Sequence, residues 1–454
     1  KTMQITQQNL DALNAEITVQ IVPADYEPQV EKSLKDYRKK MQMPGFRPGH
    51  VPASVVKQRY GKAILAEEIN KVLQDAIYKH IADNKLPVLG NPLPKADGEI
   101  GDWENPSDFT FMYEIGLAPT IDVELNDKMK FERFVVDVDD KLIDKQVRDY
   151  GRRFGKMSNP EKCGAEDLLD VRVQAVDKDG NVVEGGIDNN STITIEDVTD
   201  KKVQKQLVGL KKDDSVVVNP MLLSSDHEAI ARTLGITHHD LHHFEGDVKL
   251  TVNNIHHVEM AEFNQELYDK LFPAGTVTSV DEMRAKVREN MQEVFAKDSN
   301  WMFKRSAASQ LVETLNPALP DAFMKKWIAM SNEKPLTEEQ IEAEYPAYAH
   351  GLRRQLIESS IIEKNEIKVT VDEAVAHVKN QYAERFAQYG LPVDDAQLET
   401  MAKELLAKRE EAKNVYDVIF EDKVIEVVMS KCKVNEVEIS FDEFLNKAQH
   451  QHMH

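Results

Sequence analysis

The sequence predicts a multidomain α+β protein, and three observations carry that prediction. The chain has 454 residues, whereas one domain usually takes about 100 to 200. Residues 14–22 alternate apolar and polar side chains, as a half-buried strand does, and short segments of this kind recur between 169 and 219. Residues beyond 262 repeat apolar side chains at helical spacing. We therefore expect an α+β N-terminal domain, a mostly β middle domain and an all-α C-terminal domain in an elongated molecule.

The composition limits the kinds of partner. Hydrophobic residues make up 41% and charged residues 30% of the chain, which is slightly polar for a compact protein and suits an elongated one. The formal net charge is −22, whereas binding to nucleic acid requires clustered Lys and Arg. A general nucleic-acid-coating surface is thus excluded, but a local basic patch is not.

Targeting and redox features point to the cytoplasm. No stretch of about 18 apolar residues occurs, and residues 1–5 lack the basic flank and apolar run of a signal peptide. Cys163 and Cys432 form no CxxC or metal pattern, which favours a reducing compartment without a disulfide. We expect a soluble cytoplasmic protein with no membrane partner. Lys1 and Thr2 precede Met3 and are interpreted as a remnant of processing or cloning.

The first domain is expected to cover residues 1–118. Residues 27–41 carry apolar side chains at helical spacing and predict a surface helix. Residues 67–84 predict a second helix, and residues 109–115 alternate as a strand. A strand at 14–22 opens the domain, so strands and helices are mixed.

Basic residues are concentrated in this domain. From residue 32 to residue 62 there are nine basic residues and one acid, Asp36, a local balance of +8 in a chain of −22. Such asymmetry indicates a surface for an anionic partner, with ribosomal RNA as a natural candidate. The alternative is a solvated helix face with a chance bias in composition. The candidate patch is Lys35, Arg38, Lys39, Lys40 and Arg59.

The loop at residues 43–52 is dense in Pro and Gly and carries one aromatic and one basic side chain, Phe46 and Arg47. An exposed Phe is costly in water unless a partner covers it, and an Arg can bind phosphate or carboxylate through two parallel hydrogen bonds. These properties predict a recognition loop. The alternative is a structural hairpin whose Phe folds back into its own core.

The sequence of this loop resembles the ribosome-binding signature of the bacterial trigger factor family. Residues 45–52 read Gly-Phe-Arg-Pro-Gly-His-Val-Pro, and Gln-Arg-Tyr-Gly follows at 58–61. The resemblance implies that the loop docks at the nascent-chain exit, on a ribosomal protein and adjacent ribosomal RNA. The family often has a basic residue where Pro48 stands. The ribosome-binding residues implied are Gly45, Phe46, Arg47, Pro48, Gly49 and Pro52.

The resemblance implies a linker at 119–158 that contributes to the C-terminal body and an FKBP-like prolyl isomerase domain at 159–258. Short strands are expected at 169–176, 182–183, 191–196 and 215–219, with one helix. The family's Asp-Phe strand pair is replaced by Arg172 and Val173, and residues 200–209 contain neither proline nor aromatic residue. An FKBP-type pocket holds proline between aromatic walls. We therefore expect a degenerate domain with little or no isomerase activity.

Histidines are clustered in the same domain. His238 and His242, like His239 and His243, are four residues apart, a spacing that can hold a metal ion on one face of a helix. No HExxH motif or cysteine partner accompanies them, and Gly235 lies just before the run. The favoured interpretation is a polar surface or a linker retained in an eroded domain, with a zinc or nickel site as the alternative.

The C-terminal domain is expected at 259–454. Helices are expected from residue 279, near 319–323, and at 337–344, 348–365, 371–389, 394–408 and 412–431. The resemblance implies a concave cradle whose scattered apolar side chains hold unfolded chains weakly, and flexible Met suits such promiscuity. Candidate client-binding residues are Met324, Trp327, Ile328, Met330, Leu352, Leu356 and Phe386. For each of them the alternative is an ordinary core position.

Three functions from different classes follow from these features. The first is a chaperone that docks on the ribosome and holds nascent or unfolded polypeptides without ATP, since no phosphate-binding loop or GxGxxG motif occurs. It needs no cofactor, and the free protein is a candidate homodimer because family members can dimerise. The second is an active FKBP-type prolyl isomerase, and the third is a histidine-rich metal-binding protein.

Overall fold

The computed structural model describes residues 2–47 and 49–452. Pro48, one of the predicted ribosome-binding residues, lies outside the described residues, as does Lys1. The chain divides into two compact units, one made of Lys1–Arg133 with Asn300–Val437 and the other of Phe134–Ser299 with Glu438–His454. Each unit thus combines segments that are far apart in the sequence.

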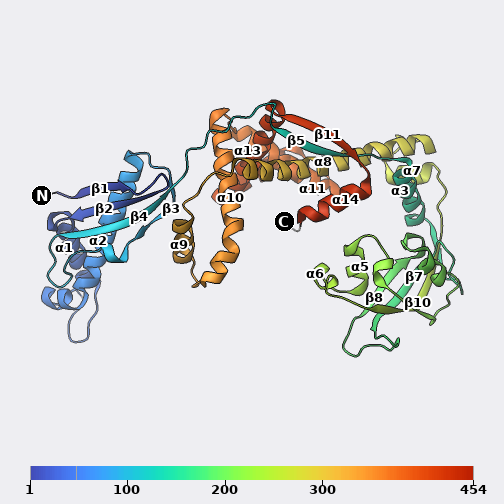
Figure 1. Ribbon diagram of the computed structural model, residues 1–454, viewed down its shortest axis with the longest axis horizontal. Helices are drawn as coiled ribbons and strands as arrows, with labels where there is room; N and C mark the ends of the chain where they lie inside the picture. Colours follow the sequence, from blue (N-terminus) through green and yellow to red (C-terminus); the bar gives the residue numbers. More distant parts are fainter. Residues whose placement is uncertain (1, 48, 453–454) are drawn as a thin grey trace. The chain divides into compact units, whose positions relative to one another are not determined.

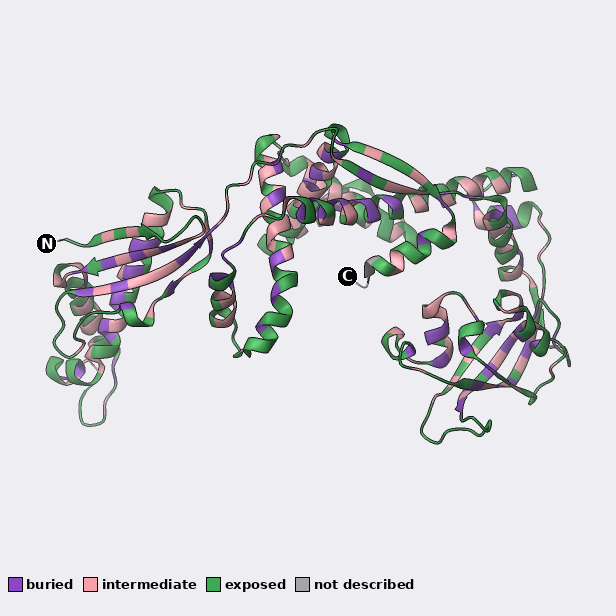
Figure 2. Cartoon of the chain, in the orientation of Figure 1, coloured by how far each residue is buried: buried purple, intermediate pink, exposed green. Residues whose placement is uncertain are grey.

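The N-terminal domain is a four-stranded antiparallel sheet covered by two helices (Figure 1). The strand order is β1-β2-β4-β3, with β1 at Gln4–Asn9, β2 at Asn14–Ile21, β3 at Val88–Pro94 and β4 at Phe109–Leu117. The alternation seen in the sequence puts the apolar side chains of β2 on the helix-covered face, where they are buried (Figure 2). The strand prediction for this region is therefore confirmed to within a residue or two at each end.

Both helices of this domain are longer than the sequence predicted. Helix α1 covers Pro23–Lys40, because proline suits a first helical position and the Asp25 carboxylate accepts a 2.8 Å hydrogen bond from the Val22 amide. Helix α2 covers Ala53–Asp83. Residues 53–66 of this helix lie before the predicted start at residue 67. The two helices contribute Tyr26, Leu65, Ile69, Leu73 and Ile77 to the core of the domain.

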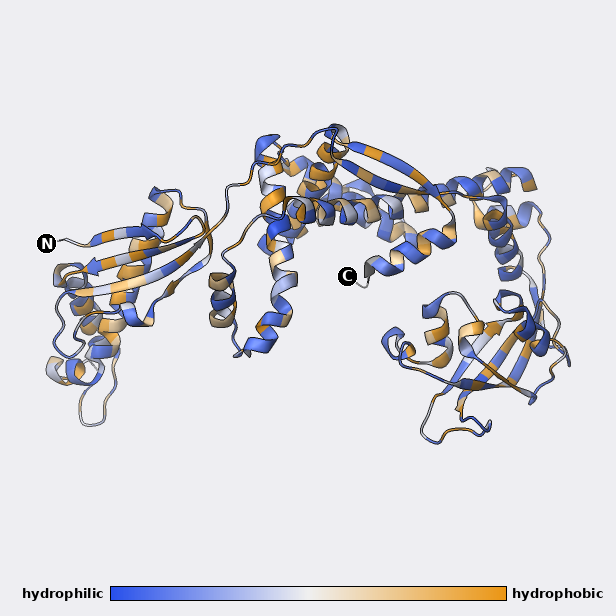
Figure 3. Ribbon diagram, viewed as in Figure 1, coloured by the Kyte–Doolittle hydropathy of each residue, from blue (hydrophilic) through white to orange (hydrophobic). Residues whose placement is uncertain are grey.

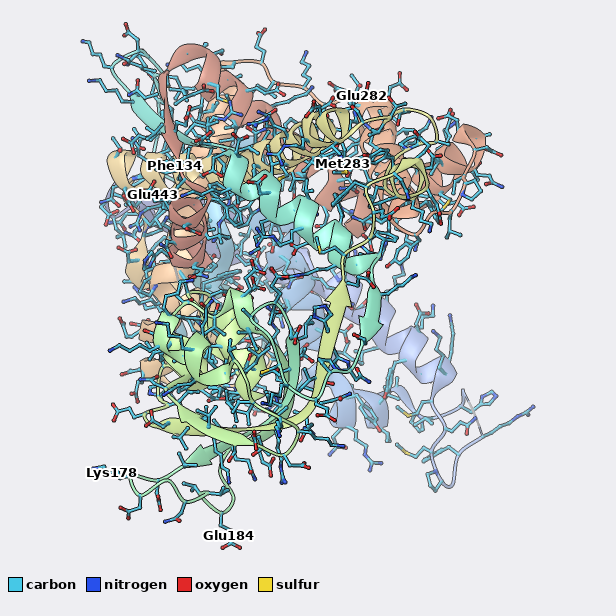
Figure 4. The ribbon with its side chains drawn as sticks, turned by 90° about the vertical axis from the view of Figure 1, so that its right-hand side faces the viewer. Phe134, Lys178, Glu184, Glu282, Met283 and Glu443 are labelled. Atoms are coloured by element: carbon cyan, nitrogen blue, oxygen red, sulfur yellow. The ribbon has the colours of Figure 1, made fainter. Side chains whose placement is uncertain are left out.

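The middle domain is a five-stranded antiparallel sheet. Its path is β6-β10-β7-β8, and β9 also pairs with β10. The strands are β6 (Lys156–Ser158), β7 (Leu168–Val176), β8 (Asp188–Thr194), β9 (Ser215–Val218) and β10 (Asp247–Glu259). The sequence did not predict β10, although Val248, Leu250 and Val252 alternate with polar residues and are fully buried. Figure 4 shows Lys178 and Glu184 in the loop between β7 and β8, pointing away from the sheet.

The expectation of one helix in the middle domain is wrong. Three helices are described there, α4 (Lys201–Leu207), α5 (His227–Leu234) and α6 (His238–Leu241). Each begins after a side chain that caps its first turn: Asp200, Asp226 and Thr237. They are short, so their apolar periodicity spans too few residues to be distinguished from that of strands.

The remaining helices carry most of the C-terminal half. They are α7 (Gln265–Leu271), α8 (Val280–Leu315), α9 (Asp321–Ser331), α10 (Glu338–Lys364), α11 (Val371–Gln388), α12 (Asp395–Leu406), α13 (Arg409–Lys431) and α14 (Phe441–His452). Helix α3 (Asp140–Arg153) precedes the middle domain, and β5 (Lys130–Val136) pairs with β11 (Lys433–Ile439). The pairing of β5 with β11 makes the C-terminal half α+β locally, and not wholly helical.

Helix α10 corrects a prediction of two separate helices. It runs through Pro346, where the sequence predicted a break. Tyr345 and Ala349, on either side, are buried in a cluster with α9, and the Tyr345 hydroxyl lies 2.5 Å from the Asp321 carboxylate. Tertiary packing therefore holds the helix together across the proline.

Hydrophobic residues recur between hydrophilic ones along the helices and strands of both units (Figure 3). No helix within the described residues is long and apolar enough to cross a membrane. The hydrophobic residues instead build separate cores, one for each sheet and several among the helices.

Candidate functional site

The loop at 43–52 connects α1 to α2 and projects beyond the ends of both helices (Figure 1). Two hydrogen bonds shape it: the Phe46 amide donates to the Met43 carbonyl at 3.1 Å, and the His50 amide donates to the Arg47 carbonyl at 2.9 Å. Gly45 and Gly49 hold the third position of these two turns, with φ of +91° and +78°. Glycine is favoured there because other residues are strained at positive φ. The two Pro-Gly dipeptides in the sequence thus explain the two turns of this loop.

A small apolar cluster supports the base of the loop. Met41 lies just before the loop and Val51 lies near its end, and both pack with Val56 from the first turn of α2. Val51 is fully buried, although it lies in a loop. These residues were not predicted from the sequence, where the available signal was an apolar side chain on each side of the Pro-Gly segment. Their packing gives the loop a fixed base.

A side-chain hydrogen bond closes the same base. The Arg38 guanidinium Nε, in the last turn of α1, donates to the Val51 carbonyl at 2.7 Å. Tyr37, from the same turn, stacks near Tyr60 of α2 with ring centres 5.0 Å apart. The two helix ends are therefore tied together beside the loop, which restricts how the loop can move.

Phe46 lies outside this cluster and is 42% exposed. Arg47 is also exposed. Burying a Phe side chain stabilises a contact by about 1.5 to 3 kcal/mol, so an exposed Phe on a held loop is a ready contact point for a partner. The alternative of a Phe folded back into a core of its own does not describe this structure.

The residues of the predicted basic patch differ in their exposure to solvent. Lys35, Lys39, Lys40 and Arg59 are exposed, whereas Arg38 is half-buried against Val51. Lys39 also makes an exposed ion pair with Asp36 at 3.2 Å. Four of the five residues thus offer their charge to solvent close to the loop in sequence, and the fifth also has a structural contact.

Further from the loop, Glu68 joins α1 to α2. Its carboxylate is 7% exposed and accepts hydrogen bonds from the Ser33 hydroxyl at 2.8 Å and from the Lys71 ammonium at 3.0 Å. Burial alone would raise the pKa of Glu68, but the hydrogen bonds from Lys71 and Ser33 outweigh it and hold the pKa below its ordinary value. Glu68 is therefore a charged carboxylate within the helix pair that presents the loop.

Most of the predicted client-binding residues pack together between α9 and α10. Met324 is 1% exposed, so the expectation that it lines an open cradle is wrong for this structure. Four more residues are half-buried at the edge of the same cluster: Trp327, Ile328, Leu352 and Leu356. The ring of Trp327 lies over Gly90, where a Cβ atom would come within 2.9 Å of it. Apolar spacing alone did not separate these packed positions from open ones.

Met330 and Phe386 differ from that group. Met330, at the end of α9, is 59% exposed and borders an open groove of about 480 Å³ together with Leu93 and Ala329. Phe386 is half-buried on α11, beside Tyr382 with ring centres 6.5 Å apart. Of the predicted client-binding residues, these two keep solvent-accessible surface.

The core of the middle domain is built mostly of aliphatic side chains, with Phe244 packed at its edge. Val173 is fully buried in the domain core, and Arg172 makes hydrogen bonds of 2.8 and 2.5 Å to the two carboxylate oxygens of Asp188. Helix α4 turns Val203 and Leu207 into the same core. Arg172, Val173, Val203 and Leu207 thus have structural contacts of their own.

The comparisons with known proteins concern all three parts of the chain. Residues 3–150 match a family model described as bacterial trigger factor protein, residues 157–260 the FKBP-like domain of probable trigger factors, and residues 299–447 their C-terminal domain. The trigger factor of Delftia acidovorans is 26% identical, covering 98% of this chain and 100% of the relative. That of Bartonella tribocorum is 24% identical, covering 98% and 92%.

A solved structure of the trigger factor chaperone is 16% identical, covers 94% of this chain and 99% of the other, and has a TM-score of 0.48. The match of N-terminal, FKBP-like and C-terminal models defines a multidomain folding chaperone with an FKBP-like module. The chain belongs to the trigger factor family.

Proposed function

We propose that this chain docks on the ribosome through the 43–52 loop and holds nascent or unfolded polypeptides without ATP. The observation that carries the proposal is Phe46, which is 42% exposed on a loop whose base is fixed by Arg38 and by the Met41 cluster. An aromatic anchor on a preorganised loop loses little conformational entropy on binding, so more of its contact energy remains as affinity.

The proposed partner surface is the nascent-chain exit of the ribosome, with an exit-site protein and adjacent ribosomal RNA. Lys35, Lys39, Lys40 and Arg59 are exposed near the loop in sequence and suit RNA phosphates. Arg47 suits either phosphate or a carboxylate of the protein. Because exposed Lys and Arg contacts to RNA are screened by salt, this binding should weaken as the ionic strength rises.

Cosedimentation with ribosomes tests the docking proposal. The Phe46→Ala/Arg47→Ala variant should bind at least tenfold more weakly than the wild type. A matched control is Arg153→Ala/Phe154→Ala, which removes another adjacent Arg and exposed Phe, at the end of α3. The control should bind like the wild type. Equal binding of all three proteins would refute docking through the loop.

Holding of unfolded chains is proposed for the helical half, with Met330 and Phe386 as accessible contacts. The wild type should suppress aggregation of a chemically unfolded client, with no change when ATP is added. Met330→Glu/Phe386→Glu should suppress it less, because a charge disfavours apolar contact. Ile100→Glu, at a 66% exposed position of the N-terminal domain, is the control. Full suppression by the double variant would exclude these two contacts.

The site of action follows from the proposed partner. A chain that docks on ribosomes acts in the cytoplasm and is partly bound to ribosomes. We also propose that the free protein forms homodimers. Sedimentation velocity of the free protein over a range of concentrations tests the dimer, which should dissociate on dilution. A single species at all concentrations with the mass of one chain would exclude it.

A further inference from the structure

Three histidines of the middle domain, far from the loop in sequence, come together on two short helices. His227 is the first residue of α5, His238 is the first residue of α6, and His242 follows the end of α6. Their ring centres are 4.7 Å apart for His238 and His242, 6.0 Å for His227 and His242, and 6.1 Å for His227 and His238. The pairing of His238 with His242 is visible in the sequence, whereas His227 joins them only through the fold.

The domain core fixes the two helices that carry these rings. Ile230, Ala231 and Leu234 of α5 and Leu241 of α6 are buried in the core cluster. Gly235, with φ of +71°, ends α5 and allows the chain to turn back toward α6. The helices under the histidines are thus held by core packing, while the histidine side chains are half-buried or exposed.

The spacing of the rings is close to that of a three-histidine metal site. Zinc bound to imidazole nitrogens at about 2.0 to 2.1 Å in a tetrahedral arrangement places the ring centres roughly 5 Å apart. His238 and His242 meet this spacing, and His227 is about 1 Å too far away. Within the described part of the chain, no group of three or more His, Cys, Asp or Glu side chains is already disposed to hold a metal ion. The rings would have to turn inward, which rotation about the side-chain bonds of surface residues allows.

The local charge favours a cation. Residues 226–247 contain five acidic residues and one arginine. Imidazole ligands suit zinc, nickel and copper ions, whereas magnesium and calcium prefer oxygen ligands. We propose that His227, His238 and His242 form a site for one divalent transition-metal ion of the zinc class, with the fourth position open to water. The ion would link α5 to α6 and stabilise this part of the middle domain.

His239 and His243 provide an internal comparison. They are also four residues apart, with ring centres 5.0 Å apart, and both are exposed. Asp240, between them in sequence, accepts a hydrogen bond from the Thr237 hydroxyl at 2.7 Å. Two imidazoles alone bind zinc more weakly than three, so this second pair is the matched control for the proposed site.

Zinc titration by calorimetry tests the proposal on the full-length protein. His450, His452 and His454 are further imidazole groups that compete for zinc. All proteins in this experiment therefore carry glutamine at these three positions. One zinc ion should bind per chain, and magnesium should not. His227→Ala and His242→Ala should each weaken zinc binding at least tenfold, whereas His239→Ala should leave it unchanged.

X-ray absorption at the zinc edge gives a second measurement, with three imidazole nitrogens expected around the ion. Without added zinc, the His227→Ala, His242→Ala and His239→Ala variants should melt at the same temperature as the zinc-free parent protein, because none of the substituted residues belongs to the core. Absence of zinc binding would overturn the proposal. So would an equal loss of binding in His239→Ala, or wild-type affinity in either His227→Ala or His242→Ala.

Discussion

The Arg38 guanidinium donates a 2.7 Å hydrogen bond to the Val51 carbonyl, so the last turn of α1 is joined to the end of the loop that carries Phe46. The bond spans 13 residues of sequence. It gives one basic residue of the predicted patch a direct contact with the backbone of the loop.

Replacing Arg38 should therefore lower the affinity for ribosomes more than replacing a residue that contributes only its charge. Arg38→Ala removes a hydrogen bond that contributes about 1 kcal/mol, so ribosome affinity should fall roughly fivefold more than in a variant that loses only charge. Lys39→Ala is the matched variant, because Lys39 is exposed and its ion pair with Asp36 is exposed as well. Equal affinities of the two variants would show that Arg38 acts only by its charge.

Two glycines should respond to alanine in opposite directions. A Cβ atom at Gly116, in β4, would lie 2.5 Å from the Phe323 ring, so Gly116→Ala should destabilise the protein by about 1 to 3 kcal/mol. At Gly351, in α10, no heavy atom lies within 4 Å of the added Cβ. Gly351→Ala should stabilise it by about 0.5 to 1 kcal/mol, since alanine loses less backbone entropy in a helix. Calorimetry gives the melting temperature of both variants. A melting temperature of Gly351→Ala below that of the wild type would contradict the predicted stabilisation.

The stability contributed by Glu68 should depend on pH. Its pKa is lowered in the folded protein because the hydrogen bonds from Lys71 and Ser33 outweigh burial. The charged form is therefore favoured by folding, and its contribution is present above the unfolded pKa of about 4.3 and is lost as the pH falls through the lower folded pKa. Glu68→Gln should lower the unfolding free energy of the N-terminal helices by about 1 to 3 kcal/mol at pH 7.

Urea unfolding of wild type and Glu68→Gln, followed by helix content, measures this contribution. The difference between the two proteins should shrink as the pH falls below about 4. A difference that stays constant from pH 7 to pH 3 would show that the charge of Glu68 is not the source of the stability.

Prolyl isomerase activity should be close to the uncatalysed rate. Arg172 is engaged with Asp188, and α4 directs Val203 and Leu207 into the core, so these residues do not supply the aromatic walls that hold a proline in an FKBP-type pocket. The assay follows isomerisation of a proline-containing tetrapeptide with the full-length protein, and an FKBP enzyme serves as the positive control. A rate near that of the control would show that a proline site exists elsewhere in the domain.

Several predictions from sequence succeeded because their signals are local. The turns of the 43–52 loop follow from two Pro-Gly dipeptides, and α10 and α11 start within one residue of the predicted starts at 337 and 371. Predictions that depended on distant contacts did less well. The sequence around Pro346 indicated a break in α10, but packing against α9 keeps the helix continuous.

The candidate sites show the same division. Met324 and Met330 lie on the same short helix and have the same side chain, yet one is 1% and the other 59% exposed. Only the packing of α9 against α10 and β3 distinguishes them. Likewise, the sequence paired His238 with His242 by spacing, while His227 joins them because α5 and α6 fold toward each other.

The sequence by itself determined the family resemblance, the Pro-Gly loop with Phe46 and Arg47, and the order of strand-rich and helix-rich regions, since these depend on residues close together in the chain. The tertiary structure decided that Arg38 holds the loop, that Met324 is core, and that His227 meets His238 and His242. The physical reason is that burial and side-chain contacts arise between segments far apart in sequence. Periodicity shows which face of an element is apolar, but not which neighbour covers it.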